Sequence, residues 1–299
     1  MLGSPQGRLS LRIGPRGLQQ DSTATSFVLV RVANQLYIGS DGFRVNLGTY
    51  KVRPYCKIGR IGNIVVLAWG LVQFGRVLPD GRVESHSLSD YWIPIASTPH
   101  ETMLQKRDRL LVQTLHLLRL QMDAEPKPSN GQRMAHGVVG AAFISMKDGI
   151  PQIGAFELRI KNWKKREFET ISFPGALAWD WQIPHGFGNT QALREILSNA
   201  RACGFRRYVE LLGAGCSNPS SLRLQFQTAP VPFVHRVLKL QTQFTPHDVG
   251  PPYAVAVLSD SGLEWIENGA CEAPFEAEPA NSSSTLGGEP SWLAPSTVN

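Results

Sequence analysis

The sequence lacks any apolar run long enough to cross a membrane. Its longest such stretches, such as IVVLAWGLV at 64–72, fall far short of the roughly 20 residues that span a bilayer. Residues 1–22 carry arginines but no continuous apolar core, so they do not resemble a secretory signal. We therefore expect no membrane segment and a cytoplasmic location.

Cysteine is also scarce. The four cysteines form no CxxC pair and no cluster with histidine at zinc spacing. In a reducing compartment they are expected to be free thiols. The histidines are scattered without ligand spacing, so neither a metal nor a cofactor is predicted.

Charged residues make up only 18% of the chain, although its net charge is +6. The run RIKNWKKREFE at 159–169 places basic residues around a tryptophan, which is one feature of nucleic-acid binding. Phosphate binding usually gathers more basic residues on one face, so this run is expected to be a solvated hairpin tip. A nucleic-acid partner is therefore disfavoured.

The 299 residues, 42% of them hydrophobic, can bury a sizeable core. The two ends differ from the middle: residues 1–22 are rich in Gly, Pro, Arg and Gln, and residues 272–299 in Ser, Pro, Glu and Gly. We predict a disordered, propeptide-like leader over 1–24, one folded domain over 25–268 and a disordered tail over 269–299.

Within the domain, β-branched and aromatic runs alternate with segments of helical periodicity. Strands, helices, strands, helices and strands follow in that order, which predicts one α+β domain rather than a parallel doubly wound sheet. The predicted strands are 26–32, 35–40, 63–69, 137–146, 151–160 and a hairpin over 253–267, and the predicted helices are 101–122, 189–202 and 232–244.

Three polar residues near the start of the domain are equally spaced. Thr25, Asp41 and Lys57 are 16 positions apart and then 16 again. Each alone is an ordinary strand or turn residue. A threonine opening a strand, a carboxylate after the return strand and a lysine in a third strand could converge on one spot of a sheet. The sequence does not fix the strand register that decides this.

This stretch resembles the amino terminus of mature proteasome β-type subunits and of HslV, the related bacterial peptidase. The double interval carries the resemblance, together with SDG in GSDGF and the glycine that closes NIVVLAWG. The hairpin GVVGAAFISMKDGIPQIGAFEL and the last helix and strands resemble the same family, so the likeness extends over much of the chain.

The resemblance implies the threonine N-terminal-nucleophile hydrolase fold, a four-layer αββα sandwich in which helices cover two antiparallel sheets. It implies Thr25 as the nucleophile after removal of the leader, Asp41 as the orienting carboxylate and Lys57 as the nearby cation. Gly70 would donate its backbone N–H to the oxyanion. Thr23 is a rival nucleophile, but only Thr25 has both intervals. The resemblance further implies a peptide or protein substrate, a homo-oligomeric ring and an ATPase or regulatory partner.

Amide cleavage explains why these residue types are needed. A threonine hydroxyl is a poor nucleophile and must give its proton to a base as it attacks. When the threonine is first in its chain, its α-amine, with a pKa near roughly 8, can accept that proton. The charge of Lys57 is expected to lower the pKa of the hydroxyl and of the amine.

The sequence departs from the family at several positions. Ala24 stands where the family usually has glycine, and Phe187 in HGFGN stands where it often has serine. Between its last helix and the following strand, the family has an aspartate and a serine ahead of two glycines. Here TPHDVGPP offers Asp248, no serine and only Gly250. Residues 71–100 contain an additional turn-rich segment. Two hypotheses therefore stay open: a self-processing threonine peptidase, and an uncleaved, weakly active or inactive subunit with a structural or partner-binding role.

Overall fold

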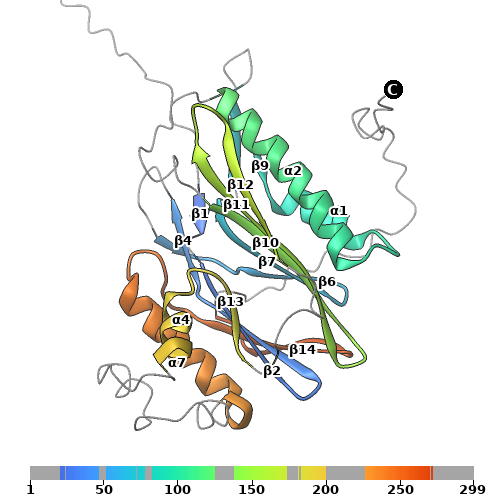
Figure 1. Cartoon of the computed structure of the whole chain (residues 1–299), viewed down its shortest axis with the longest axis vertical. Coiled ribbons are helices and arrows are strands. Elements are labelled where there is room, and N and C mark those ends of the chain that lie inside the picture. The colour runs from blue at the N-terminus through green and yellow to red at the C-terminus, as the bar shows by residue number, and fades with distance from the viewer. Residues whose placement is uncertain are drawn as a thin grey trace, which may run out of the picture.

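Two antiparallel sheets pack face to face in the computed structural model, with helices against their outer faces (Figure 1). The α+β class with antiparallel sheets is thus confirmed. The described residues are 21–23, 25–46, 52–71, 73–77, 83–124, 138–173, 181, 183–199, 226–269 and 271.

The larger sheet has eight strands in the order β12-β11-β10-β7-β1-β4-β5, and β6 also pairs with β7. Strand β7 is central, because β10 lies on one side of it and both β6 and β1 lie on the other. The strands are β1 (Asp21–Thr23), β4 (Phe43–Asn46), β5 (Val52–Pro54), β6 (Ile58–Ile61), β7 (Ile64–Leu71), β10 (Val138–Lys147), β11 (Ile150–Asn162) and β12 (Glu167–Ser172).

The smaller sheet has five strands in the order β13-β2-β3-β14-β15. A separate two-stranded hairpin, β8 with β9, follows β7 in the chain. The strands are β2 (Ser26–Val32), β3 (Gln35–Ser40), β8 (Gln73–Val77), β9 (Val83–Ser87), β13 (His185–Gly188), β14 (Ala254–Ser259) and β15 (Gly262–Glu267).

Helices cover the outer face of each sheet. Helix α2 packs on β10 and β11 of the larger sheet, and α7 packs on β2 and β3 of the smaller one. Figure 1 shows α1 and α2 along one side of the molecule and α4 and α7 along the other. The described helices are α1 (Ser89–Ser97), α2 (Met103–Ala124), α4 (Gln191–Asn199) and α7 (Pro230–Phe244).

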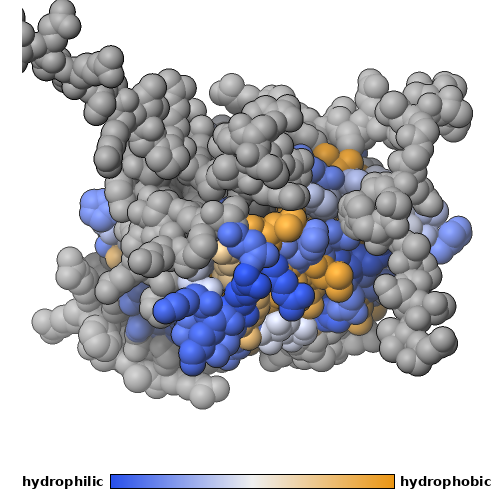
Figure 2. Space-filling view, turned by 90° about the horizontal axis from the view of Figure 1, so that it is seen from above, coloured by the Kyte–Doolittle hydropathy of each residue, from blue (hydrophilic) through white to orange (hydrophobic). Residues whose placement is uncertain are grey.

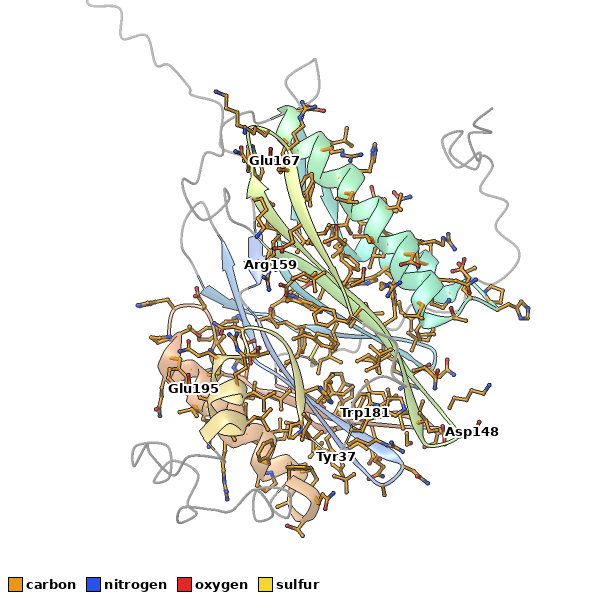
Figure 3. All side chains as sticks on the ribbon, viewed as in Figure 1. Tyr37, Asp148, Arg159, Glu167, Trp181 and Glu195 are labelled. Carbon is orange, nitrogen blue, oxygen red and sulfur yellow. A yellow bond between two sulfur atoms is a disulfide. The ribbon has the colours of Figure 1, made fainter. Side chains whose placement is uncertain are left out.

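The alternation of side chains along β7 explains how it serves two cores. Val65, Leu67 and Trp69 face the core between the sheets, whereas Val66 and Ala68 face the core beneath α1 and α2. A strand buried on both faces reads as a continuous apolar run, which is why NIVVLAW lacks polar alternation. Side chains fill the space between the sheets and beneath the helices (Figure 3).

The predicted elements occur with modest shifts in their bounds. The predicted helix 101–122 is α2, and the predicted helix 232–244 begins two residues earlier as α7. The predicted helix 189–202 corresponds to α4, and residues 200–202 lie outside the described part of the chain. The region 71–100, in which a turn-rich segment was expected, contains β8, β9 and α1.

The basic run 159–169 forms the end of the β11–β12 hairpin, which carries Arg159 and Glu167 in Figure 3. Opposite charges pair along it. Lys161 Nζ lies 2.8 Å from Glu169, and Arg159 Nε lies 2.8 Å from Glu157. These pairs offset much of the positive charge, which favours a solvated hairpin over a phosphate-binding surface.

The free-thiol prediction is wrong for two of the four cysteines. Cys56 and Cys271 form a disulfide that joins the segment before β6 to the chain after β15. Folding brings them together across a sequence separation of 215, so their spacing could not reveal the pair. Cys203 and Cys216 lie outside the described residues. The cytoplasmic location stays a prediction, without the support of reduced thiols.

Parts of both ends that were predicted to be disordered have defined positions. Asp21–Thr23 form β1 inside the larger sheet, although they belong to the predicted leader. Cys271, in the predicted tail, is buried in the core between the sheets. Strand pairing holds residues 21–23 and the disulfide holds Cys271, and neither interaction can be predicted from amino-acid composition. The rest of both ends, residues 1–20 and 272–299, lies outside the described residues.

Within the described residues, no helix is long and apolar enough to cross a membrane. Among the described residues visible from above, hydrophilic ones predominate and hydrophobic ones lie between them (Figure 2). Large apolar side chains that are exposed include Val112 on α2 and Ile266 on β15. These two lie on different elements, and isolated apolar side chains on a surface are ordinary.

Replacing Cys56 and Cys271 together with serine should lower the free energy of unfolding by about 2–5 kcal/mol, because the disulfide closes a long loop. Urea unfolding, with and without a dithiol reductant, measures this. The wild type should weaken in reductant to the stability of the double variant, whose midpoint should not respond. A wild-type midpoint that is equal in both solvents would contradict the disulfide.

Candidate active site

The centre of the candidate site is the Asp41 carboxylate, which is fully buried just after β3. It accepts three hydrogen bonds. Ser26 N donates to Oδ1 at 2.8 Å, Lys57 Nζ donates to Oδ2 at 2.8 Å, and Phe43 N donates to Oδ2 at 3.2 Å. The Asp41 carboxylate therefore joins Ser26, the residue after Thr25, to Lys57, which lies 16 positions after Asp41.

Lys57 lies directly before β6 and is buried, with its ammonium group on Asp41. The next residue, Ile58, pairs with Leu67 of β7, so the β6–β7 register fixes where the lysine starts. The preceding residue is Cys56 of the disulfide. Lys57 was expected within a third strand and instead precedes it. The possibility of a solvent-exposed strand face is excluded, because both side chains of the pair are completely buried.

Burial dominates the titration of both groups. It lowers the pKa of the Lys57 ammonium from the usual 10.5, and the Asp41 carboxylate opposes that shift. Burial likewise raises the pKa of Asp41 from its usual 3.8, and Lys57 opposes that shift by its charge and hydrogen bond. Each group opposes the shift of the other, since either alone would favour its neutral form in this environment.

Thr25 is buried immediately before β2, and a turn of the chain holds its backbone. Its carbonyl accepts a hydrogen bond of 2.6 Å from Asn189 N, directly after β13. Gly188 has a φ of +71°, and a Cβ there would lie 2.2 Å from the Thr25 carbonyl oxygen. Only glycine fits such a position without displacing the backbone of Thr25.

Phe187, in the same turn, is part of the core. Its ring stacks on Trp69 with centroids 4.9 Å apart, and it meets Phe173 edge to face at 5.3 Å. The residue that departs from the family's serine therefore packs between the sheets. This contact also braces Trp69, which is adjacent to Gly70.

Gly70 has a φ of +81° near the end of β7. A Cβ there would lie 1.8 Å from the Val138 carbonyl oxygen, so a side chain is excluded. Gly70 pairs with Val139 on one side and with Thr23 of β1 on the other. It therefore lies opposite the residue two positions before Thr25.

Three residues join this site that were not among the predicted site residues. Asp248 acts on Lys57 through its charge, which raises the pKa of the lysine and so favours its ammonium form. Asn189 and Thr245 belong to the network around the Thr25 carbonyl. The TPHDVGPP motif pointed to Asp248, whereas nothing in the sequence singled out the other two.

The structure thus brings Asp41 and Lys57 into direct contact. Thr25 directly precedes Ser26, which donates a hydrogen bond to Asp41, and Gly70 lies opposite Thr23 of the predicted leader. The described residues contain no group of three or more His, Cys, Asp or Glu that could hold a metal ion. The groups that the structure gathers at the site are a hydroxyl, a buried ion pair and backbone donors. The catalytic roles of the four residues stay predictions.

No family model matches the chain, and a search of the curated proteins finds no match either. Function is therefore inferred from the positions of these residues and from their chemistry. The most informative feature is a charged pair that is costly to bury, next to a buried threonine.

Replacing Lys57 with Met should lower the free energy of unfolding by about 3–5 kcal/mol at neutral pH, because it leaves Asp41 buried without its cation. The pKa of Asp41 then rises further. Above pH 3.8, the usual pKa of Asp, Asp41 keeps its proton in the folded variant but has lost it in the unfolded chain. The free energy of unfolding of the variant therefore falls as pH rises towards the raised pKa of Asp41. The loss relative to wild type should therefore be smaller at about pH 5 than at neutral pH. Urea unfolding at both pH values measures it.

The matched control is Arg109→Met, which removes the cation from a partly exposed pair with Glu101. It should cost no more than about 1 kcal/mol and show no comparable pH dependence. A Lys57→Met protein as stable as wild type at neutral pH would show that the Asp41–Lys57 pair is not buried in solution.

Proposed function

We propose that this protein is a proteasome-like threonine hydrolase, a peptidase that cleaves amide bonds after it has removed its own leader before Thr25. The observation that carries the proposal is the buried Asp41 carboxylate, bonded both to Ser26 N and to Lys57 Nζ. The order of helices, sheet, sheet and helices supports the four-layer fold of the N-terminal-nucleophile hydrolases, which is part of the proposal.

In this proposal, breaking the bond between Ala24 and Thr25 exposes the α-amine of Thr25. That amine accepts the hydroxyl proton as Oγ1 attacks the substrate carbonyl carbon, and it then passes the proton to the leaving amine. The acyl group stays on Oγ1 as an ester until water hydrolyses it. Lys57, with its charge sustained by Asp41 and Asp248, lowers the pKa of the attacking hydroxyl. The backbone N–H of Gly70 stabilises the oxyanion.

Strand β1 supports a peptide as the substrate. It lies antiparallel between β4 and β7, with Ser22 opposite both Val45 and Leu71, and Thr23 opposite Gly70. An extended peptide can add to a sheet in this way, because main-chain hydrogen bonds bind it whatever its sequence. Once the leader has left, the same two strands would present their backbone groups to a substrate.

The proposal extends to assembly and location. A homo-oligomeric ring and an ATPase or regulatory partner are carried by the resemblance alone. A cytoplasmic location was expected because residues 1–22 do not resemble a secretory signal, whereas the Cys56–Cys271 disulfide favours an oxidising compartment. These points do not affect the chemistry proposed for Thr25.

The alternative is an uncleaved subunit with a structural or partner-binding role. The pairing of β1 on both sides favours it, since residues before Thr25 are integrated into the larger sheet. The two functions differ in whether the purified chain begins at Thr25.

Purified, folded protein should begin at Thr25, because Thr25 directly precedes Ser26, whose backbone N–H binds the Asp41 carboxylate. Thr25→Ala should leave the full-length chain, since no hydroxyl remains to attack the preceding carbonyl. Intact mass and amino-terminal sequencing give the answer. Thr23→Ala is the matched control and should be processed as wild type. A folded wild type that stays at full mass would overturn the peptidase proposal and favour the uncleaved subunit.

Activity tests Lys57 directly. In a chain made with Thr25 already exposed, by removal of a fused partner directly before it, Lys57→Met should slow peptide hydrolysis by orders of magnitude. The substitution removes the cation that favours the deprotonated hydroxyl. Turnover of a fluorogenic peptide, normalised to the folded fraction, measures it, with Arg109→Met as the control. Equal turnover in the two folded variants would show that the lysine acts on structure alone.

A further inference from the structure

The hydroxyl of Thr245, at the C-terminal end of α7, is at the centre of a polar network beside the site. It accepts hydrogen bonds from Asn189 Nδ2 at 3.2 Å and from Gln241 Nε2 at 3.1 Å, and it donates to the Gln241 carbonyl at 3.2 Å. A hydroxyl has one proton and two lone pairs, so this one is fully used.

One branch of the network leads to Thr25. Asn189, whose side chain binds Thr245, donates its backbone N–H to the Thr25 carbonyl at 2.6 Å. Gly188, directly before it, fits against that carbonyl only because it has no Cβ. The position of the Thr25 backbone is therefore coupled to the side-chain amide of Asn189.

A second branch leads to the ion pair. The Thr245 carbonyl accepts hydrogen bonds of 3.0 Å from both Asp248 N and Val249 N, which forms the turn that follows α7. Asp248 in turn favours the charged form of Lys57. Thr245 thus holds the Asp248 turn through its carbonyl and the Thr25 turn through its hydroxyl.

Gln241 anchors the network. Its side chain is completely buried, and its Oε1 accepts a hydrogen bond of 2.8 Å from Ala192 N in the first turn of α4. The same amide donates to Thr245, so α4 and α7 are fixed to each other at this point. Thr245 and Asn189 are partly buried around this anchor, and a hydrogen-bonded network of this kind holds one arrangement more firmly than its separate bonds would.

We propose that Thr245 is a positioning residue for the Thr25 reaction: its hydroxyl, through Asn189, sets where Thr25 lies relative to the Asp41–Lys57 pair. This inference rests on the proposed function. Thr245 does not touch the reacting atoms. Loss of its hydroxyl should slow the chemical step and leave binding of a peptide almost unchanged, because small displacements of a nucleophile cost rate steeply.

The experiment uses the full domain with Thr25 already exposed and a peptide vinyl sulfone as the probe, which a nucleophilic hydroxyl adds to covalently. Thr245→Val keeps the shape of the side chain and removes the hydroxyl. Its maximal labelling rate should fall about 10- to 100-fold, with the half-saturating probe concentration changed less than about threefold. Thr245→Ser should restore most of the rate.

Thr242→Val is the matched control on the same helix. The Thr242 hydroxyl bonds to the Leu238 carbonyl at 3.0 Å and to the Tyr253 hydroxyl at 2.8 Å, so its loss also removes partly buried polar contacts. Its labelling rate should equal that of wild type. Should Thr245→Val not fold, Asn189→Ala, which removes the side-chain amide and keeps the backbone N–H that binds the Thr25 carbonyl, is expected to slow labelling in the same way.

Failure of this inference is distinguishable from failure of the proposed function. A folded wild type with Thr25 exposed that is not labelled would overturn both. A labelled wild type with an equal rate in folded Thr245→Val, or in Asn189→Ala, would overturn the positioning role alone. So would an equal loss of rate in Thr242→Val, which would show that any lost hydroxyl on α7 has the same effect.

Discussion

The rest of the site depends on one buried ion pair. The side chains of Asp41 and Lys57 are completely buried and therefore desolvated. In buried ion pairs the attraction between the two charges alone rarely offsets the free-energy cost of desolvation. Two backbone donors, Ser26 N and Phe43 N, complete the coordination of the carboxylate. The start of β2, the end of β3 and the segment before β6 must therefore meet at one point. Buried charged groups of this kind are common at functional sites.

The two sheets make this meeting point reproducible. A shift of one residue in β7 would exchange the side chains of its two cores, so burial on both faces fixes its register. That register places β6, and with it Lys57, and it places Gly70 opposite Thr23. The smaller sheet fixes Thr25 and Asp41 through the β2–β3 hairpin. The site lies where the two sheets contribute neighbouring strand ends.

Sequence could predict the local parts of this structure and not the contacts between distant segments. Turn residues and apolar runs predicted the hairpins and helices, and the equal spacing predicted that Asp41 and Lys57 could meet. The disulfide and the pairing of β1 were missed, because each depends on residues far apart in the chain. Asn189 and Thr245 were missed because a turn and a helix end look ordinary until folding brings them together.

The position of β1 links the leader to the site through geometry. Residues 21–23 occupy the space between β4 and β7, where the backbone groups of both strands are engaged. A peptide bound along the same strands would need those residues to leave first, since two chains cannot pair with one edge. In the proposed peptidase, self-cleavage before Thr25 would therefore expose the α-amine and also release the strand that covers the binding edge. Cleavage of the bond before Thr25 would therefore start both the catalytic activity and the binding of substrate.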